Sequence, residues 1–256
     1  MPQWDADIYL RFANERTQPV RDLIHRIQLE NPRRIVDLGC GPGNSTAELR
    51  ERWPSSTIVG LDSSREMIDK ARAAYPDGAW EVGDAAVWQA PEPFDLVFSN
   101  AMLQWVPNHA QLCRHLFRQV APGGALAAQA PAHYKSPLHR EILDISRDPA
   151  WNDRMAGARE AMTKESPAFY YDQLQADASH VDVWETIYHH VLSGPEAVLE
   201  WFRGTGLRPF LEVLVSTNER QRFESLLLER YTVAYPRRAN GRILFPFRRL
   251  FFVAYR

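Results

Sequence analysis

Hydrophobic residues in the first half of the chain follow two alternating patterns. Short continuous apolar runs are each followed by a stretch whose apolar positions recur at helical spacing. Such alternation predicts strands and helices in turn. The predicted strands are 34–38, 57–62, 80–85, 94–100 and 125–130, and the clearest predicted helices between them are 45–53 and 109–120. Five successive β–α units predict an α/β protein with a doubly wound parallel sheet, in which all five carboxyl ends reach one edge.

The remainder of the chain departs from this alternation. Two helices are expected before the first strand, one over 4–16 and one beginning at Pro19. Residues 133–181 are polar and helical, which predicts an inserted cap. Strands at 183–192 and 243–255 are expected to enclose helices at 196–202 and 219–235. We therefore expect one domain over 1–256, made of a helical lid (1–30), a cofactor-binding core (31–132), a helical cap (133–181) and C-terminal strands and helices that complete the sheet (182–256).

A glycine turn joins the first strand to the helix behind it. Asp37 lies near the end of that strand, and Gly39 and Gly41 follow. Glycines there allow a ligand to lie against bare backbone, in front of the N–H groups that begin the next helix. A dinucleotide fingerprint needs a third glycine where Asn44 stands, and no P-loop lysine follows. The turn therefore predicts a nucleotide-type ligand of another kind.

Polar residues also follow the second, third and fourth strands. Asp62 is placed to accept hydrogen bonds from ribose hydroxyls, and Asp84 to accept one from an adenine amino group. Because the strand ends share one edge, we expect these groups to line a single cleft. The residues expected to contact the ligand are Asp37, Gly39, Gly41, Asn44, Asp62, Ser63, Met67, Asp84, Ala85 and Asn100.

Composition narrows the classes of partner. The 256 residues carry a net charge of −2 and a pI near 6.5, so no basic field favours nucleic acid. No apolar run reaches the length of a membrane span, and no secretory signal pattern is seen. Two cysteines form no disulfide framework, and no metal-binding motif occurs. We expect a cytoplasmic protein without metal, nucleic acid or membrane partners, and composition gives no oligomeric state.

The order of these motifs across about residues 34–130 resembles the class I S-adenosylmethionine-dependent methyltransferases. The motifs are D-x-G-x-G-x-G at 37–43, an acid after strand two, Gly-Asp-Ala at 83–85, Ser-Asn at 99–100 and Pro-Gly-Gly at 122–124. The resemblance implies a seven-stranded sheet with an antiparallel last strand. It also implies S-adenosylmethionine as the methyl donor and S-adenosylhomocysteine as the product.

Three further segments resemble the branch of that family that methylates trans-aconitate. They are 4–23, 201–210 and 244–251, and with them the resemblance covers nearly the whole chain. It implies a small polycarboxylate as the substrate and a monomethyl ester as the product. Arg248 and Arg249 differ from the local pattern of that branch. The difference bears on the identity of the methyl acceptor more than on that of the methyl donor.

A carboxylate acceptor places specific demands on the site. It is already ionised at neutral pH, so no general base is required and no catalytic residue is assigned. Arginine guanidiniums match the geometry of the remaining carboxylates. Adjacent strand residues point to opposite faces, so only one of Arg248 and Arg249 is expected in the pocket. The substrate-binding candidates are Tyr9, His133, Tyr134, Arg203 and Arg249, with Arg208 and Arg248 as further arginines.

Other functions compete with this hypothesis. A hydroxyl or amine acceptor would need a base, for which His133 is the candidate. Protein methylation stays open, whereas Ser99-Asn100-Ala101-Met102 lacks the element that grips a flipped nucleobase. A nicotinamide oxidoreductase and a non-catalytic cofactor-binding module are the alternatives outside the methyltransferases.

Overall fold

The computed structural model of the chain describes residues 13–256. Its strands are β1 (Arg34–Leu38), β2 (Thr57–Asp62), β3 (Ala79–Val82), β4 (Phe94–Asn100), β5 (Val120–Pro131), β6 (His180–Leu192) and β7 (Ile243–Tyr255). Its helices are α2 (Ala13–Arg26), α3 (Asn44–Arg52), α4 (Arg65–Ala74), the 3₁₀ turn η1 (Leu103–Trp105), α5 (His109–Arg118), α6 (Pro137–Ile145), α7 (Ala156–Arg159), α8 (Pro167–Leu174), α9 (Pro195–Arg203), α10 (Arg208–Glu212) and α11 (Thr217–Ala234).

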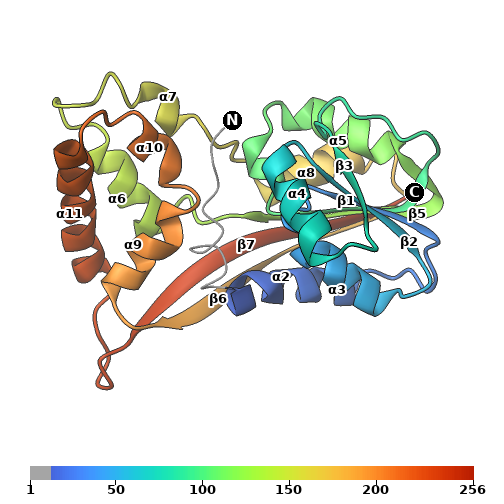
Figure 1. The fold of residues 1–256 in the computed structure, drawn as a ribbon, viewed down its shortest axis with the longest axis horizontal. Helices are drawn as coiled ribbons and strands as arrows, with labels where there is room; N and C mark the ends of the chain where they lie inside the picture. The colour runs from blue at the N-terminus through green and yellow to red at the C-terminus, as the bar shows by residue number, and fades with distance from the viewer. Residues whose placement is uncertain (1–12) are drawn as a thin grey trace.

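All seven strands form one sheet in the order β3-β2-β1-β4-β5-β7-β6. The first five strands run parallel, and β7 lies antiparallel between β5 and β6 (Figure 1). This confirms the predicted seven-stranded, mostly parallel sheet with an antiparallel last strand. β1 is buried over four of its five residues, Asp37 among them, as expected of a strand covered on both faces.

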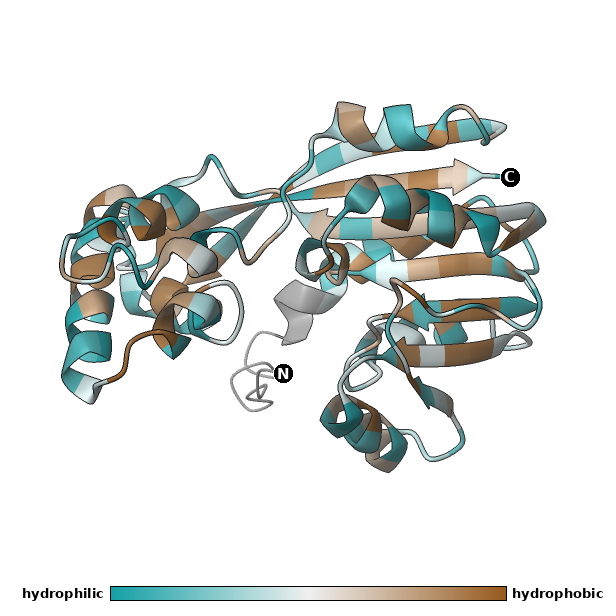
Figure 2. Ribbon diagram, turned by 90° about the horizontal axis from the view of Figure 1, so that it is seen from above, coloured by the Kyte–Doolittle hydropathy of each residue, from teal (hydrophilic) through white to brown (hydrophobic). Residues whose placement is uncertain are grey.

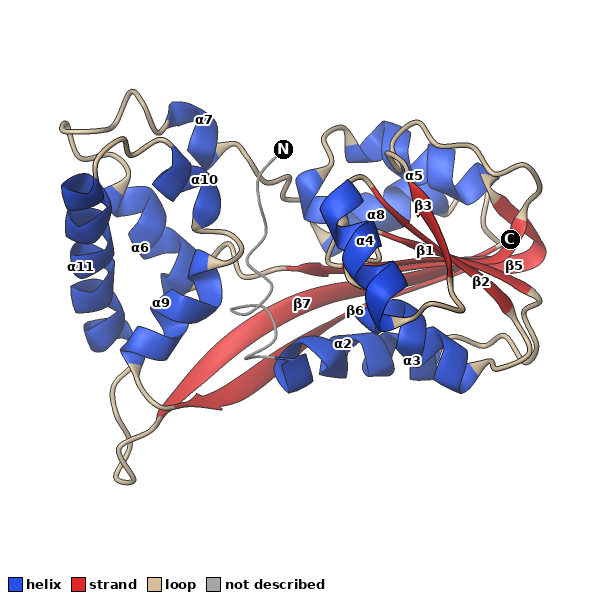
Figure 3. Cartoon of the chain, viewed as in Figure 1, coloured by secondary structure: helices blue, strands red, loops and turns tan. Residues whose placement is uncertain are grey.

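Helices cover both faces of the sheet. On one face α2 and α3 pack against it, with Leu23 and Leu49 in the same core as Phe98 and Phe251. On the other face α5 and α8 pack against it (Figure 3). The parallel strands therefore end at an edge that neither layer of helices covers, where open α/β sheets bind ligands.

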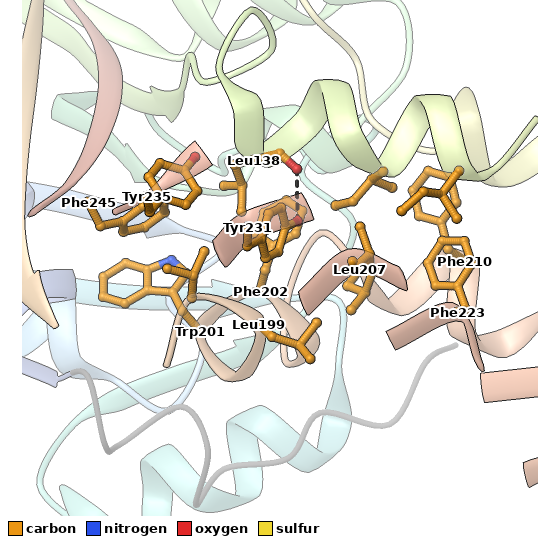
Figure 4. Packing of buried hydrophobic residues seen from close by; sticks show 14 of the residues in the cluster. Leu138, Leu199, Trp201, Phe202, Leu207, Phe210, Phe223, Tyr231, Tyr235 and Phe245 are labelled. Atoms are coloured by element: carbon orange, nitrogen blue, oxygen red, sulfur yellow. Dashed lines mark hydrogen bonds between the residues drawn. The ribbon is translucent and has the colours of Figure 1, made fainter. Parts of the chain in front are cut away.

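A second hydrophobic core lies at the far end of β6 and β7. It is formed by α6, α7, α9, α10 and α11, and we call these five helices the cap. In Figure 4, Trp201, Phe245 and Tyr235 pack together, and the Tyr231 hydroxyl donates a 2.9 Å hydrogen bond to the Leu138 carbonyl. β6 and β7, 13 residues each, connect the two cores (Figure 2).

The structure differs from the predicted elements in several places. Pro19 lies inside α2 instead of beginning a helix, because the burial of Val20, Leu23 and Ile24 against the sheet outweighs the backbone hydrogen bond that proline removes. Within 133–181, expected to be helical, α7 is only four residues long. β5 begins earlier than expected, at Val120, because this residue pairs with Phe94 across a register shift.

The cap is built from two separate stretches of sequence. Residues 133–181, expected to form it, supply α6 and α7, while α8 turns back onto the sheet beside α5. The other three cap helices come from between β6 and β7. The division into lid, core, cap and C-terminal part stays a prediction. Residues 1–12 of the expected lid lie outside the described residues.

Candidate active site

A cavity of about 970 Å³ lies between the carboxyl edge of the parallel strands and the cap. Nine of the ten residues expected to contact the ligand line it: Gly39, Gly41, Asn44, Asp62, Ser63, Met67, Asp84, Ala85 and Asn100. The rest of the lining includes residues of α4, β5, η1, α9, α10 and β7, and His133 in the loop after β5. The first group forms the glycine-turn end of the cavity and the second includes its cap end.

The glycine turn has a backbone that other residues adopt with difficulty. Gly39 has φ 71° and Gly41 has φ 55°. A Cβ on Gly39 would come within 2.4 Å of the Cβ of Met102. The Gly39 N–H donates to the Leu61 carbonyl at 2.8 Å, which holds the turn against β2. Because α3 begins at Asn44, directly after the turn, its unpaired N–H groups lie beside the cavity.

Asp37 lies beneath the turn and is fully buried, and it is not among the residues that line the cavity. One oxygen, Oδ2, accepts hydrogen bonds from Ser45 Oγ at 2.6 Å and Thr46 Oγ1 at 2.7 Å. Oδ1 has no hydrogen-bond partner among the described residues. Burial raises the pKa of Asp37 to about 6, against the two hydroxyls that lower it. Asp37 thus ties the start of α3 to β1.

Asp62 fastens the turn from the neighbouring strand. Its Oδ2 accepts the Gly41 N–H at 2.9 Å and its Oδ1 accepts the Ser64 N–H at 2.8 Å. Burial raises the pKa of Asp62, and these two hydrogen bonds oppose the rise. Each carboxylate oxygen can accept more than one hydrogen bond, so Asp62 retains acceptor capacity toward the cavity.

Two amide side chains border the cavity near the end of β4, Asn100 on that strand and Gln104 in η1. Asn100 Oδ1 and Gln104 Oε1 have no hydrogen-bond partner within residues 13–256, and both residues line the cavity. Ala101, between them, has φ 56°, a left-handed conformation that is uncommon for alanine and typical of ligand-binding sites. Gln104 was not predicted, although its position just after the fourth strand placed it near the same edge.

His133 lies at the cap end of the cavity and is 3% exposed. Its ring centroid is 4.8 Å from that of Phe247 and 5.3 Å from that of Phe202. Neither ring nitrogen has a hydrogen-bond partner among the described residues. Burial, together with the nearby His139 and Arg249, holds the pKa of His133 well below its usual value. The imidazole is therefore neutral and can donate one hydrogen bond into the cavity.

Two arginines reach the cavity from different elements. Arg249 of β7 is 5% exposed; its Nη1 donates to Gln129 Oε1 at 3.1 Å, and its guanidinium lies 4.8 Å from the centre of the Phe247 ring. Arg208 belongs to α10 of the cap, where it pairs with Glu212 at 3.1 Å. The cap end thus combines positive charge with aromatic walls.

The other candidate residues lie elsewhere. Arg203 forms two hydrogen bonds with Glu224, at 2.7 and 3.0 Å, and does not line the cavity. Arg248 pairs with Glu185 at 2.8 Å on the surface, which is the outcome expected from strand alternation. Tyr134 stands behind His133 and donates to the Thr163 carbonyl at 3.3 Å. Tyr9 lies outside the described residues.

Neither a metal-binding cluster nor a membrane-spanning helix is found among residues 13–256. No group of three or more histidine, cysteine or acidic side chains is arranged to hold a metal ion. None of the helices in this range combines the length and the apolar character that crossing a membrane requires.

Comparisons with known proteins agree with this geometry. A family model described as a methyltransferase domain matches residues 35–124. Trans-aconitate 2-methyltransferase of Azoarcus sp. is 46% identical over the full length of both chains. The enzyme of the same name from Methylobacterium nodulans is 46% identical over 100% of this chain and 99% of its own.

Solved structures share the fold at low sequence identity. The YcgJ protein of Bacillus subtilis has a TM-score of 0.60 and 13% identity, over 93% of this chain and 98% of its own. Phosphoethanolamine N-methyltransferase 2 of Haemonchus contortus, in complex with S-adenosyl-L-methionine, has a TM-score of 0.58 and 15% identity, over 93% of this chain and 52% of its own. At these identities the likeness shows the fold alone.

Proposed function

The chain belongs to the trans-aconitate 2-methyltransferase family, and on this premise we propose that it transfers a methyl group from S-adenosylmethionine to one carboxylate of trans-aconitate, giving the monomethyl ester. The observation that carries the proposal is the position of Arg249. This buried arginine lines one end of a cavity whose other end is formed by the glycine turn and Asp62.

The glycine-turn end fits the methyl donor. The bare backbone of Gly39 and Gly41 and the start of α3 would hold the donor's methionine part, with Asn100 Oδ1 as a buried acceptor. Asp62 would accept from the ribose hydroxyls and Asp84 from the adenine amino group. When bound, S-adenosylmethionine supplies a methyl carbon attached to a positively charged sulfur. A carboxylate oxygen that attacks this carbon forms the ester bond as the carbon–sulfur bond breaks, and the sulfur becomes the neutral thioether of S-adenosylhomocysteine.

The cap end fits a polycarboxylate. Arg249 and Arg208 would each pair with a carboxylate that is not methylated, and neutral His133 would donate a hydrogen bond to an acceptor oxygen. With the acceptor bound, the aromatic walls would displace water that otherwise solvates a carboxylate nucleophile. Holding the polyacid by its other carboxylates leaves one oxygen positioned for in-line attack.

The structure does not favour a hydroxyl or amine acceptor. Such an acceptor needs a base, and the depressed pKa of His133 makes it a weak one at neutral pH. The nicotinamide alternative is set aside because the chain belongs to a methyltransferase family. We further propose that the protein acts in the cytoplasm on a small molecule, without nucleic acid or membrane partners.

Transfer of an isotopically labelled methyl group tests the function directly. The purified protein, labelled S-adenosylmethionine and trans-aconitate should yield a product whose label is released by mild alkali, as expected of a methyl ester. Parallel reactions with an alcohol and an amine acceptor should remain unlabelled. No transfer to trans-aconitate or to any other polycarboxylate would reject the proposal.

A further inference from the structure

We propose that Gln129 is a positioning residue that holds the Arg249 guanidinium toward the acceptor while adding no opposing charge beside it. The inference rests on the proposed function, because it concerns how Arg249 meets an anionic acceptor. It assigns a role to a residue that does not itself line the cavity.

Strand register places the two side chains side by side. β5 and β7 are antiparallel, with Gln129 opposite Phe251 and Pro131 opposite Arg249. Gln129 and Arg249 are therefore diagonal neighbours on one face of the sheet, within reach of long side chains. Gln129 is fully buried and Arg249 is 5% exposed, so their 3.1 Å hydrogen bond is shielded from water.

The amide orientation follows from the chemistry of arginine. A guanidinium has only donors, so Gln129 must present its oxygen to Arg249. Its Nε2 is then directed away and has no hydrogen-bond partner among the described residues. Gln129 therefore leaves a buried amide nitrogen without a hydrogen bond, which in most proteins lowers the free energy of unfolding. A purely structural contact would be served better by a residue without that N–H group.

Glutamate at position 129 would stabilise the fold more than glutamine does. The presence of glutamine therefore indicates a requirement other than stability. Glutamate has nearly the same shape and would form a charge-assisted hydrogen bond with the same guanidinium. It would also place a negative charge about 3 Å from the group that is to bind an anion, and like charges compete strongly in a buried site. Glutamine supplies the hydrogen bond without adding a charge that would compete with the substrate for the guanidinium.

Two substitutions separate these effects. Gln129→Glu keeps the hydrogen bond and adds the charge, so we expect the KM for trans-aconitate to rise about 10- to 100-fold with kcat within about threefold. Gln129→Met keeps the volume and removes the acceptor, so we expect a smaller rise in KM, about 3- to 10-fold. In both variants the Kd for S-adenosylhomocysteine should stay within about twofold, because the glycine-turn end is untouched. A merely structural role would instead change the melting temperature, the cofactor affinity and kcat together.

The same series distinguishes this inference from the proposed function. If the unaltered protein methylates trans-aconitate and Gln129→Glu has an unchanged KM, the inference fails and the function stands. If the unaltered protein shows no transfer, the proposed function fails. The role of Gln129 is then tested by calorimetry, in which trans-aconitate is titrated into the unaltered protein and into Gln129→Glu, each loaded with S-adenosylhomocysteine. Equal affinity of the unaltered protein and Gln129→Glu, or no binding by either, would overturn the role of Gln129. Should Gln129→Glu not fold, the KM of Gln129→Met decides, and an unchanged value overturns the inference.

Discussion

The two ends of the cavity are built in different ways. At the glycine-turn end the supporting contacts are short in sequence: Asp37 binds Ser45 and Thr46, eight and nine residues ahead, and Asp62 binds Gly41, 21 residues back. At the cap end Arg249 is held by Gln129, 120 residues away, and Arg208 comes from a helix inserted between two strands. The glycine-turn end is therefore formed by neighbouring β–α units, while the cap end depends on how distant parts of the chain pack together.

This difference has a functional meaning. A donor that is the same throughout a family can be bound by one compact motif, whereas the acceptor must be matched by residues outside it. Changes at one end should therefore affect one ligand and spare the other.

Gly39→Ala should have the largest effect. The new methyl group would lie 2.4 Å from Met102 Cβ, on a backbone with φ 71°, so we expect a loss of about 3 kcal/mol in unfolding free energy and a more than 100-fold weaker affinity for S-adenosylhomocysteine. Gly123→Ala is the matched control, since Gly123 has φ 78° but nothing within 4 Å of its added Cβ. Equal losses in the two variants would show that the turn is not specially constrained by Met102.

Arg249→Met should reduce kcat/KM for trans-aconitate about 30- to 300-fold, because a buried charge-assisted contact to the acceptor is lost. The Kd for S-adenosylhomocysteine should change by less than about threefold. Arg248→Met is the control: this neighbour points to the other face and pairs with Glu185, so both constants should stay near their original values. Similar losses in the two variants would remove Arg249 from the site.

Asp62→Ala should weaken binding of S-adenosylhomocysteine roughly 10- to 100-fold, since hydrogen bonds to a carboxylate contribute on the order of 1.5–3 kcal/mol. Titration calorimetry measures it, and the KM for trans-aconitate at saturating donor should be unaffected. Asp69→Ala, on the exposed side of α4, is the control. An unchanged Kd in Asp62→Ala would show that this carboxylate serves only to fasten the turn.

Acidification should destabilise the fold through its buried histidines. Burial lowers the pKa of His139 and of His190 to about 4, and that of His133 well below its usual value. Between those values and about pH 6.5 the unfolded chain binds more protons, so stability falls as the pH falls through this window. The raised pKa of Asp37 acts in the opposite direction, from about pH 6 down to pH 4, and the raised pKa of Asp62 acts in the same sense as that of Asp37. These two carboxyls oppose three histidines, so the net effect of acid is a loss of stability.

Urea unfolding at pH 7.5 and pH 5.5 measures this loss. His190 does not line the cavity and packs on Trp201, so His190→Phe should keep the contact and remove one titrating group. The variant should lose about 1 kcal/mol less than the unaltered protein over the same interval. A loss of equal size would mean that His190 is not held neutral by the fold.

Arg203→Ala should have the smallest effect on catalysis. Arg203 is paired with Glu224 away from the cavity, so the KM for trans-aconitate should change by less than about twofold. Stability should fall by at most about 1 kcal/mol, as for a partly exposed ion pair. A large rise in KM would mean that the acceptor also depends on Arg203, which lies outside the cavity.

The separation between local and distant contacts also explains how far the sequence predicts the molecule. The five parallel β–α units and the placing of nine expected residues at one edge of the sheet follow from periodicity, turn chemistry and the crossover rule, all of which act over short stretches. The antiparallel last strand was expected only from the family resemblance. Gln104 is missed because no motif marks it, although it lies in η1 just after β4. Arg203 and Arg249 look equivalent in sequence, and only the partners that packing gives them, Glu224 and Gln129, separate them.

The most direct test of a cavity with a donor end and an acceptor end is a crystal structure of the protein with S-adenosylhomocysteine and trans-aconitate. We predict the ribose hydroxyls on Asp62, one acceptor carboxylate on Arg249, and another facing the sulfur of the donor product. A polyacid bound away from Arg249 and Arg208, or an adenosyl group away from the turn at Gly39 and Gly41, would contradict the account.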